Sequence, residues 1–108
     1  MQEVFMVLDP LVARVVQRIA RVVRPTRIIL FGSRAKGKAR ANSDLDLLVV
    51  YDGPLSKRAL KLRIHDLFLE REFSMDLFVL TSEEFERQKK VVSTVGRVAD
   101  REGVVCYG

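Results

Sequence analysis

Tryptophan is absent from this 108-residue chain, and cysteine and histidine occur once each. Because Cys106 has no second cysteine to pair with, an internal disulfide is excluded, and with it a disulfide-stabilised scaffold. His65 likewise has no second histidine or cysteine nearby with which to hold a metal ion. No apolar run reaches the roughly 18 residues of a membrane span, and the N-terminus shows no secretory signal pattern. These absences lead us to expect one small cytoplasmic domain over residues 1–108, with no membrane contact.

Aromatic residues are scarce as well, at 7% of the chain, although the net charge of +5 is typical of proteins that bind nucleic acids. The aromatic residues stand mostly in apolar stretches, which leaves no exposed platform on which bases could stack. Many of the cations recur at helical spacing between apolar residues, as a solvated helix surface does. They are Arg14, Arg18, Arg21, Lys57, Lys61 and Arg63. Direct binding of nucleic acid is therefore not expected.

Apolar periodicity and chain-breaking residues predict helices that alternate with short strands. Asp9 followed by Pro10 is typical of a helix start, and the residue before a proline ends a helix, here at Arg24. Strands are expected over 27–31, 44–51 and 74–80, with a short fourth one over 104–107. Ser56 begins an expected helix whose apolar stripe consists of Leu60, Ile64, Leu67 and Phe68. A capping box of Thr81 and Glu84 opens the next helix, and a last helix is expected over 89–102. This order predicts an α/β (α+β) domain in which helices pack on a small mixed sheet.

Two aspartates of the second expected strand stand where charge is costly. Asp44 and Asp46 are two residues apart, so their side chains share one face of the strand, with Cα atoms roughly 6.5–7 Å apart. Like charges on an otherwise apolar strand repel each other and lose their water on burial. A bound divalent cation such as Mg²⁺ would offset both costs. The alternative is that Asp44 is a turn residue and that Asp46 pairs with a surface arginine.

A third acid and a glycine turn point to the same place. Asp76 stands between apolar residues in the third expected strand, and three such acids suggest a common site rather than one edge residue that faces solvent. Upstream, the first expected strand runs into Gly32-Ser33-Arg34. Glycine lets the backbone approach a ligand closely, Ser33 offers a hydroxyl, and Arg34 offers a forked cation suited to phosphate oxygens. Alone, this tripeptide is more often a plain turn than a phosphate-binding loop. Ahead of paired acids that could hold a metal ion, it indicates a phosphate-binding site.

Gly32-Ser33, ten further residues and then Asp44-x-Asp46 resemble the signature of the DNA polymerase β-like nucleotidyltransferase superfamily. The segment over 32–49 is most similar to the minimal nucleotidyltransferases, small bacterial and archaeal proteins that consist of little beyond the catalytic fold. The similarity extends along essentially the whole chain, to the closing Gly-Val-Val-x-Tyr. The resemblance therefore implies the polymerase β-like nucleotidyltransferase fold.

This resemblance also implies a role for each matching residue. Gly32 and Ser33 would contact the triphosphate of a nucleotide, and Asp44 and Asp46 would hold two Mg²⁺ ions, or Mn²⁺. Asp76 would be the third catalytic carboxylate and metal ligand, and would help to activate the attacking hydroxyl. The implied reaction is in-line attack of that hydroxyl on the α-phosphate of a nucleoside triphosphate, with pyrophosphate leaving.

A basic loop separates the two halves of the motif. It contains Arg34, Lys36, Lys38 and Arg40. We expect Arg34 to bind the phosphates of the nucleotide. The other three cations either do the same, meet an acidic or RNA-bearing partner, or form a solvated loop.

The resemblance further implies that AMP is transferred from ATP to a hydroxyl of a partner protein. Minimal nucleotidyltransferases are often encoded beside a helical toxin of the HEPN type, which they adenylylate as antitoxins. The short chain agrees with an acceptor that another molecule presents, and exposed apolar helix surface would favour a homodimer or a partner complex. The alternative is a non-catalytic binding module that neutralises its partner by occlusion. A small-molecule transferase is disfavoured, because such proteins carry an added domain.

Overall fold

A computed structural model describes residues 10–36, 44–69 and 73–108 of the chain. Its elements are α1 (Pro10–Val23), β1 (Arg27–Phe31), β2 (Leu45–Val50), α2 (Lys57–Asp66), β3 (Met75–Leu80), α3 (Ser82–Gln88), α4 (Val95–Glu102) and β4 (Val104–Tyr107). Within these ranges, four strands form one sheet in the order β3-β2-β1-β4. Helices that pack on a small sheet confirm the predicted α+β fold class.

The sheet is mixed because its strands pair in both directions. β1 pairs antiparallel with β2 and with β4, whereas β2 pairs parallel with β3. A parallel pair needs a crossover connection, and α2 supplies it between β2 and β3. The crossover brings the first residues of β3 beside the first residues of β2, with Asp76 opposite Asp46.

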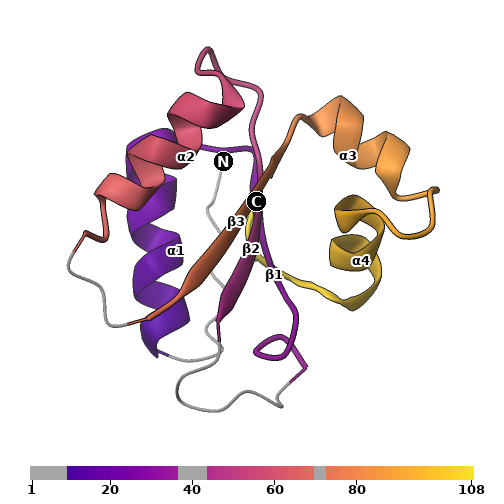
Figure 1. The fold of residues 1–108 in the computed structure, drawn as a ribbon, viewed down its shortest axis with the longest axis horizontal. Helices are drawn as coiled ribbons and strands as arrows, with labels where there is room; N and C mark the ends of the chain where they lie inside the picture. Colours follow the sequence, from indigo (N-terminus) through magenta and orange to yellow (C-terminus); the bar gives the residue numbers. More distant parts are fainter. Residues whose placement is uncertain (1–9, 37–43, 70–72) are drawn as a thin grey trace.

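Each face of the sheet is covered by a pair of helices, α1 and α2 on one face and α3 and α4 on the other (Figure 1). Successive side chains of a strand point to opposite faces, so β2 contributes to both cores. Leu45, Leu47 and Val49 pack in the α1–α2 core, and Leu48 and Val50 pack in the α3–α4 core. All five are buried. Burial on both faces explains the continuous apolar runs of the sequence.

Most elements agree with the sequence-based expectation, and the strand ends differ by one residue at most. Helix α1 is confirmed, although its expected cap, Asp9, lies outside the described residues. Helix α2 ends at Asp66, so Leu67 and Phe68 of the predicted stripe follow the helix in a turn, where both are half-buried. Cys106 is buried in the core as a free cysteine. Among the described elements, no helix is both long and apolar enough to span a bilayer.

Helix α4 is shorter than the sequence suggests. The helix expected over 89–102 begins only after Thr94, which is its N-cap. Ser93 has a positive φ of 69°, a conformation that a right-handed helix excludes. The Thr94 hydroxyl donates a hydrogen bond to the carbonyl of Gln88, the last residue of α3. The prediction was wrong before Thr94, because these local hydrogen bonds compete with the helix.

The predicted capping box at the start of α3 is confirmed, and it makes stability depend on pH. The Glu84 carboxylate accepts a hydrogen bond from the Thr81 backbone N–H at 2.8 Å and pairs with Lys57 Nζ at 2.7 Å. The hydrogen bond from Lys57, followed by that from Thr81, lowers the pKa of Glu84. Because this pKa is lower in the folded chain, the stabilisation is present above the unfolded pKa of about 4.3 and is lost as the pH falls through the folded value.

Replacement of this carboxylate should therefore matter at neutral pH and much less in acid. We expect Glu84→Ala to lower the free energy of unfolding by about 0.5–1 kcal/mol near pH 7. The difference from the wild type should shrink as the pH falls from the unfolded pKa of about 4.3 through the lower folded value, because the wild-type carboxyl becomes protonated there. Urea unfolding of both proteins near pH 7 and pH 3 measures the effect. An equal difference at the two pH values would contradict it.

Candidate active site

The site begins where β1 ends, at Gly32. This glycine has a positive φ of 77°, which residues with a Cβ rarely adopt. A Cβ built there would lie 2.2 Å from Oδ2 of Asp46, far inside van der Waals contact. The backbone of the glycine turn therefore lies directly against the Asp46 carboxylate. The fold has brought the two halves of the sequence motif together.

Three adjacent strands place Asp46 and Asp76 in one row beside the glycine turn. In the sheet register, Phe31 is opposite Asp46, and Asp46 is opposite Asp76. Neighbouring strands lie about 4.8 Å apart, and directly opposite side chains point to the same face. The two carboxylates are therefore side by side on the face that α3 and α4 cover.

The Asp46 carboxyl is affected by both of the other predicted acids. Partial burial raises its pKa, and the charge of Asp76 together with a hydrogen bond to Asp76 raises it further. Asp44 adds a smaller contribution in the same direction. The three acids are thus close enough to interact electrostatically, and they gather negative charge at one end of the sheet.

These acids are more exposed than the sequence suggests. Asp46 is half-buried, whereas Asp44 and Asp76 are exposed. The expectation of costly burial therefore holds only in part, and only for Asp46. The reasons are that β3 is an edge strand and that Asp44 stands just before β2 instead of within it. Solvent therefore reaches the carboxylates.

The donor set of this acidic cluster suits a hard divalent cation. Carboxylate oxygens favour Mg²⁺ or Mn²⁺ over softer metals. Across the described parts of the chain, no group of three or more His, Cys, Asp or Glu side chains is arranged to hold a metal ion by itself. Mg²⁺ is ordinarily bound by one or two carboxylates together with water and substrate phosphates. The Asp46–Asp76 pair, with Asp44 near it, fits an ion that is shared with a triphosphate.

Gly32 also opens the turn that carries the predicted phosphate-binding residues. The Lys36 N–H lies 3.3 Å from the Gly32 carbonyl oxygen and 3.2 Å from that of Ser33, so these residues form one tight turn. Ser33 is exposed and Arg34 is half-buried within it. The turn holds both side chains at the end of β1 that meets Asp46. Outside the described residues lie the other two cations of the basic loop, Lys38 and Arg40.

Two features near the acids escaped the sequence-based prediction. Phe78 follows Asp76 by two residues on the same face of β3, remains 37% exposed, and has its ring centroid 5.5 Å from that of Phe31. Strand alternation over 75–80 was the signal that could have placed it there. The second feature is an ion pair between Lys36 and Glu102. It joins residues far apart in the chain, so no pattern of neighbouring residues in the sequence predicts it.

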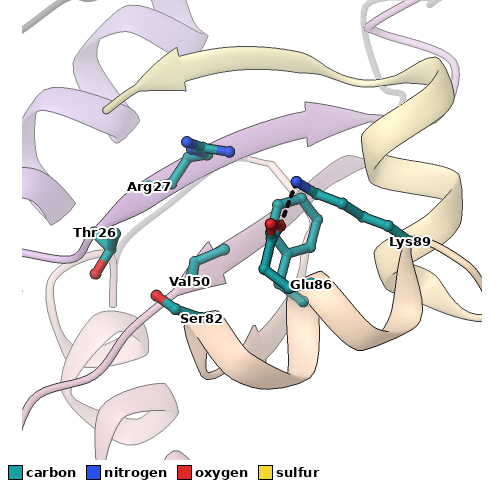
Figure 2. A pocket seen from close by; sticks show the side chains of 7 residues that line it. Thr26, Arg27, Val50, Ser82, Glu86 and Lys89 are labelled. Carbon is teal, nitrogen blue, oxygen red and sulfur yellow. Dashed lines mark ion pairs between the residues drawn. The ribbon is translucent and has the colours of Figure 1, made fainter.

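A separate pocket of about 140 Å³ opens at the other end of β1 (Figure 2). It is lined by Thr26, Arg27, Val50, Ser82, Phe85, Glu86 and Lys89. Lys89 pairs with Glu86 and lies 4.8 Å from the centroid of the Phe85 ring, and the Arg27 guanidinium lies 6.0 Å from the same centroid. None of the predicted site residues lines this pocket, so the candidate site is the acidic end of the sheet.

Comparison with known proteins defines the class to which this fold and site belong. The nucleotidyltransferase domain family matches residues 12–99, which include every predicted site residue. The chain therefore belongs to the nucleotidyltransferase domain family, as the motif of Gly32-Ser33 and Asp44-x-Asp46 predicted. No curated protein matches the chain in sequence.

Two solved structures share the fold. One is a toxin–antitoxin crystallised with AMP-PNP; it is 22% identical, has a TM-score of 0.54, and aligns over 88% of this chain and 72% of its own. The other is a protein from Sulfolobus solfataricus described as a candidate nucleotidyltransferase; it is 21% identical, has a TM-score of 0.51, and aligns over 85% of this chain and 72% of its own. This likeness confirms the expected nucleotidyltransferase architecture.

Proposed function

We propose that this nucleotidyltransferase transfers AMP from ATP to a hydroxyl of a partner protein, with Mg²⁺ or Mn²⁺ as its cofactor. The observation that carries the proposal is the contact between Gly32 and Asp46, with Asp76 beside Asp46 on the next strand. A turn able to hold phosphate thus meets carboxylates able to hold a cation. Membership of the family supports nucleotidyl transfer, and the structural neighbour crystallised with AMP-PNP supports ATP as the donor.

The triphosphate would lie on the turn that Gly32 opens. Without a side chain at Gly32, the backbone allows an anion to approach closely. The exposed Ser33 hydroxyl can donate a hydrogen bond to a phosphate oxygen, and Arg34 adds positive charge from the same turn. The distal phosphates would therefore lie over the end of β1, and the α-phosphate would lie beside Asp46.

Asp46 and Asp76 would hold the divalent ions, and Asp44 would complete the set. When bound, the ions would neutralise the phosphates and stabilise the charge that develops during transfer. Asp46 has a second task, because its carboxylate touches the backbone at Gly32. It would keep the phosphate-binding turn in a fixed position relative to the acids.

The transfer exchanges one phosphorus–oxygen bond for another. The acceptor oxygen bonds to the α-phosphorus while the bond from that phosphorus to the oxygen bridging to the β-phosphate breaks, and pyrophosphate leaves with the electron pair. Asp76 is exposed on an edge strand, where an acceptor can reach it. It would take the proton of the attacking hydroxyl as general base.

A partner protein presents the acceptor in this proposal. Several large apolar side chains are exposed, among them Leu55, Leu62, Leu69, Val91, Val92 and Val105. Those of them that stand on and beside α2, Leu55, Leu62 and Leu69, could contact a partner or a second copy of the chain. The toxin–antitoxin among the structural neighbours supports a toxin as the partner, and a helical toxin of the HEPN type fits the resemblance seen in the sequence.

Mass spectrometry of the partner tests this function. Incubated with ATP, Mg²⁺ and the wild-type chain, the protein encoded beside this one should gain the mass of AMP, and its toxicity should fall. The Asp44→Asn/Asp46→Asn variant should add no AMP and should not neutralise the partner. If that variant neutralises the partner as well as the wild type does, occlusion and not catalysis is the mechanism.

A further inference from the structure

Lys36 ends the turn that Gly32 opens, and an acid from a distant element holds its side chain. Lys36 Nζ lies 2.6 Å from Oε1 of Glu102, the last residue of α4. The two side chains are 48% and 45% exposed, so both can exchange partners with solvent or with a ligand. This ion pair joins the candidate phosphate-binding turn to the end of α4.

The ion pair lies next to the place where the triphosphate would bind. A Cβ on Gly103, the residue after Glu102, would lie 3.0 Å from the Leu30 carbonyl oxygen, so the end of α4 lies against the end of β1. Lys36 follows Ser33 by three residues in a tight turn, and residues at that spacing point to the same side. The Lys36 ammonium can therefore face either Glu102 or a phosphate on Ser33.

Glu102 does not stabilise the helix that carries it. A carboxylate in the last turn of a helix faces the negative end of the helix dipole, which is unfavourable. An exposed ion pair of this kind also adds little to folding stability. Glu102 therefore gains nothing from the dipole of α4, and its contact with the glycine turn is the ion pair with Lys36.

We propose that Lys36 is a further triphosphate-binding residue and that Glu102 is its counter-ion in the nucleotide-free protein. A triphosphate carries several negative charges, so it would take Lys36 from the single carboxylate of Glu102. The apparent affinity is then reduced by the fraction of molecules in which Lys36 is engaged by Glu102. Glu102 thus sets how tightly the nucleotide is held. This inference rests on the proposed nucleotide site at Gly32 and Asp46.

Removal of the competing carboxylate should tighten nucleotide binding. Glu102→Gln should lower the Kd for AMP-PNP with Mg²⁺ by about two- to fivefold, the range set by an exposed ion pair. Lys36→Met should raise that Kd by about tenfold or more. In the double variant, the gain from Glu102→Gln should vanish, because no lysine is left to release. Isothermal titration calorimetry of the four proteins measures these constants.

A matched control and a stability measurement exclude a merely structural effect. Glu83→Gln removes the acid of an exposed ion pair with Arg87, 3.9 Å apart on α3, and should leave the Kd unchanged. The Tm of Glu102→Gln should stay equal to that of the wild type or rise slightly. A lower Tm without tighter binding would show that Glu102 only supports the fold, and would overturn the proposal.

The remaining outcomes separate this inference from the proposed function. A gain from Glu102→Gln that persists without Lys36 would mean that Glu102 repels the nucleotide through space, and the inference fails. If the wild type binds AMP-PNP, Asp46→Asn does not, and Glu102→Gln equals the wild type, this inference alone fails. If the wild type binds no AMP-PNP, both the proposed function and this inference fail.

Discussion

Asp46→Asn is expected to lower the rate of nucleotidyl transfer by about a thousandfold or more, because it removes the charge that, in the proposed site, would hold the metal ion shared with the phosphates. Asp46 touches the glycine turn and lies opposite Asp76. The amide of asparagine keeps the shape of the side chain but is a poor ligand for a hard cation. Release of pyrophosphate from ATP in the presence of the partner measures the rate.

The stability of this variant should not fall. The pKa of Asp46 is raised by burial and by its acidic neighbours, so the folded state holds this charge at a cost. The Tm of Asp46→Asn should therefore equal or exceed that of the wild type, which separates lost activity from lost structure. Asp100→Asn, on an exposed position of α4, serves as the matched control and should retain full activity. A transfer rate of Asp46→Asn within about threefold of the wild-type rate would show that Asp46 is not a catalytic residue.

Gly32→Ala is the second change with a large expected effect. The new methyl group would meet Oδ2 of Asp46 at 2.2 Å, and the φ of 77° is itself strained for alanine. We expect the Asp46 carboxylate to be displaced and the transfer rate to fall by about a hundredfold, as is typical of a misplacement near 1 Å. The strain should also lower the free energy of unfolding by about 1–2 kcal/mol. Transfer kinetics and urea unfolding measure the two effects.

A double-mutant cycle identifies the collision as the cause. Asp46→Ala removes the atoms that the new methyl group would meet, so Gly32→Ala should cost less stability in that background. The loss of stability that remains in that background would come from the left-handed backbone conformation of residue 32 alone. Equal costs in both backgrounds would show that the contact between Gly32 and Asp46 does not constrain the turn.

Local signals in the sequence predicted the elements and the motif of the site. An apolar run ended by Gly32 is a local pattern, and so is the apolar run of β2 in which Asp46 stands among buried neighbours. The capping box of Thr81 and Glu84 depends on residues three apart, and it formed as predicted. In each case, the physical cause lies within one element of the chain.

Features that depend on distant parts of the chain were not predictable in this way. A common site for Asp46 and Asp76 was predicted, but their register was not, because α2 carries the chain across to a parallel β3 and a pattern within one strand does not specify which residues become opposite. Apolar neighbours make Asp76 look buried, yet β3 lies at the edge of the sheet. The pair of Lys36 and Glu102 forms only because α4 ends beside the glycine turn.

In the function that we propose, Gly32 and the acids beside it form one site for a nucleotide and divalent ions. Calorimetric titration of the wild-type chain with AMP-PNP, in the presence of Mg²⁺ and again with EDTA, tests it most directly. We expect saturable binding of one nucleotide per chain with Mg²⁺, and binding at least about tenfold weaker without it, since the acids would then repel the phosphates. Binding of equal strength with and without the metal, or no binding at all, would contradict the account.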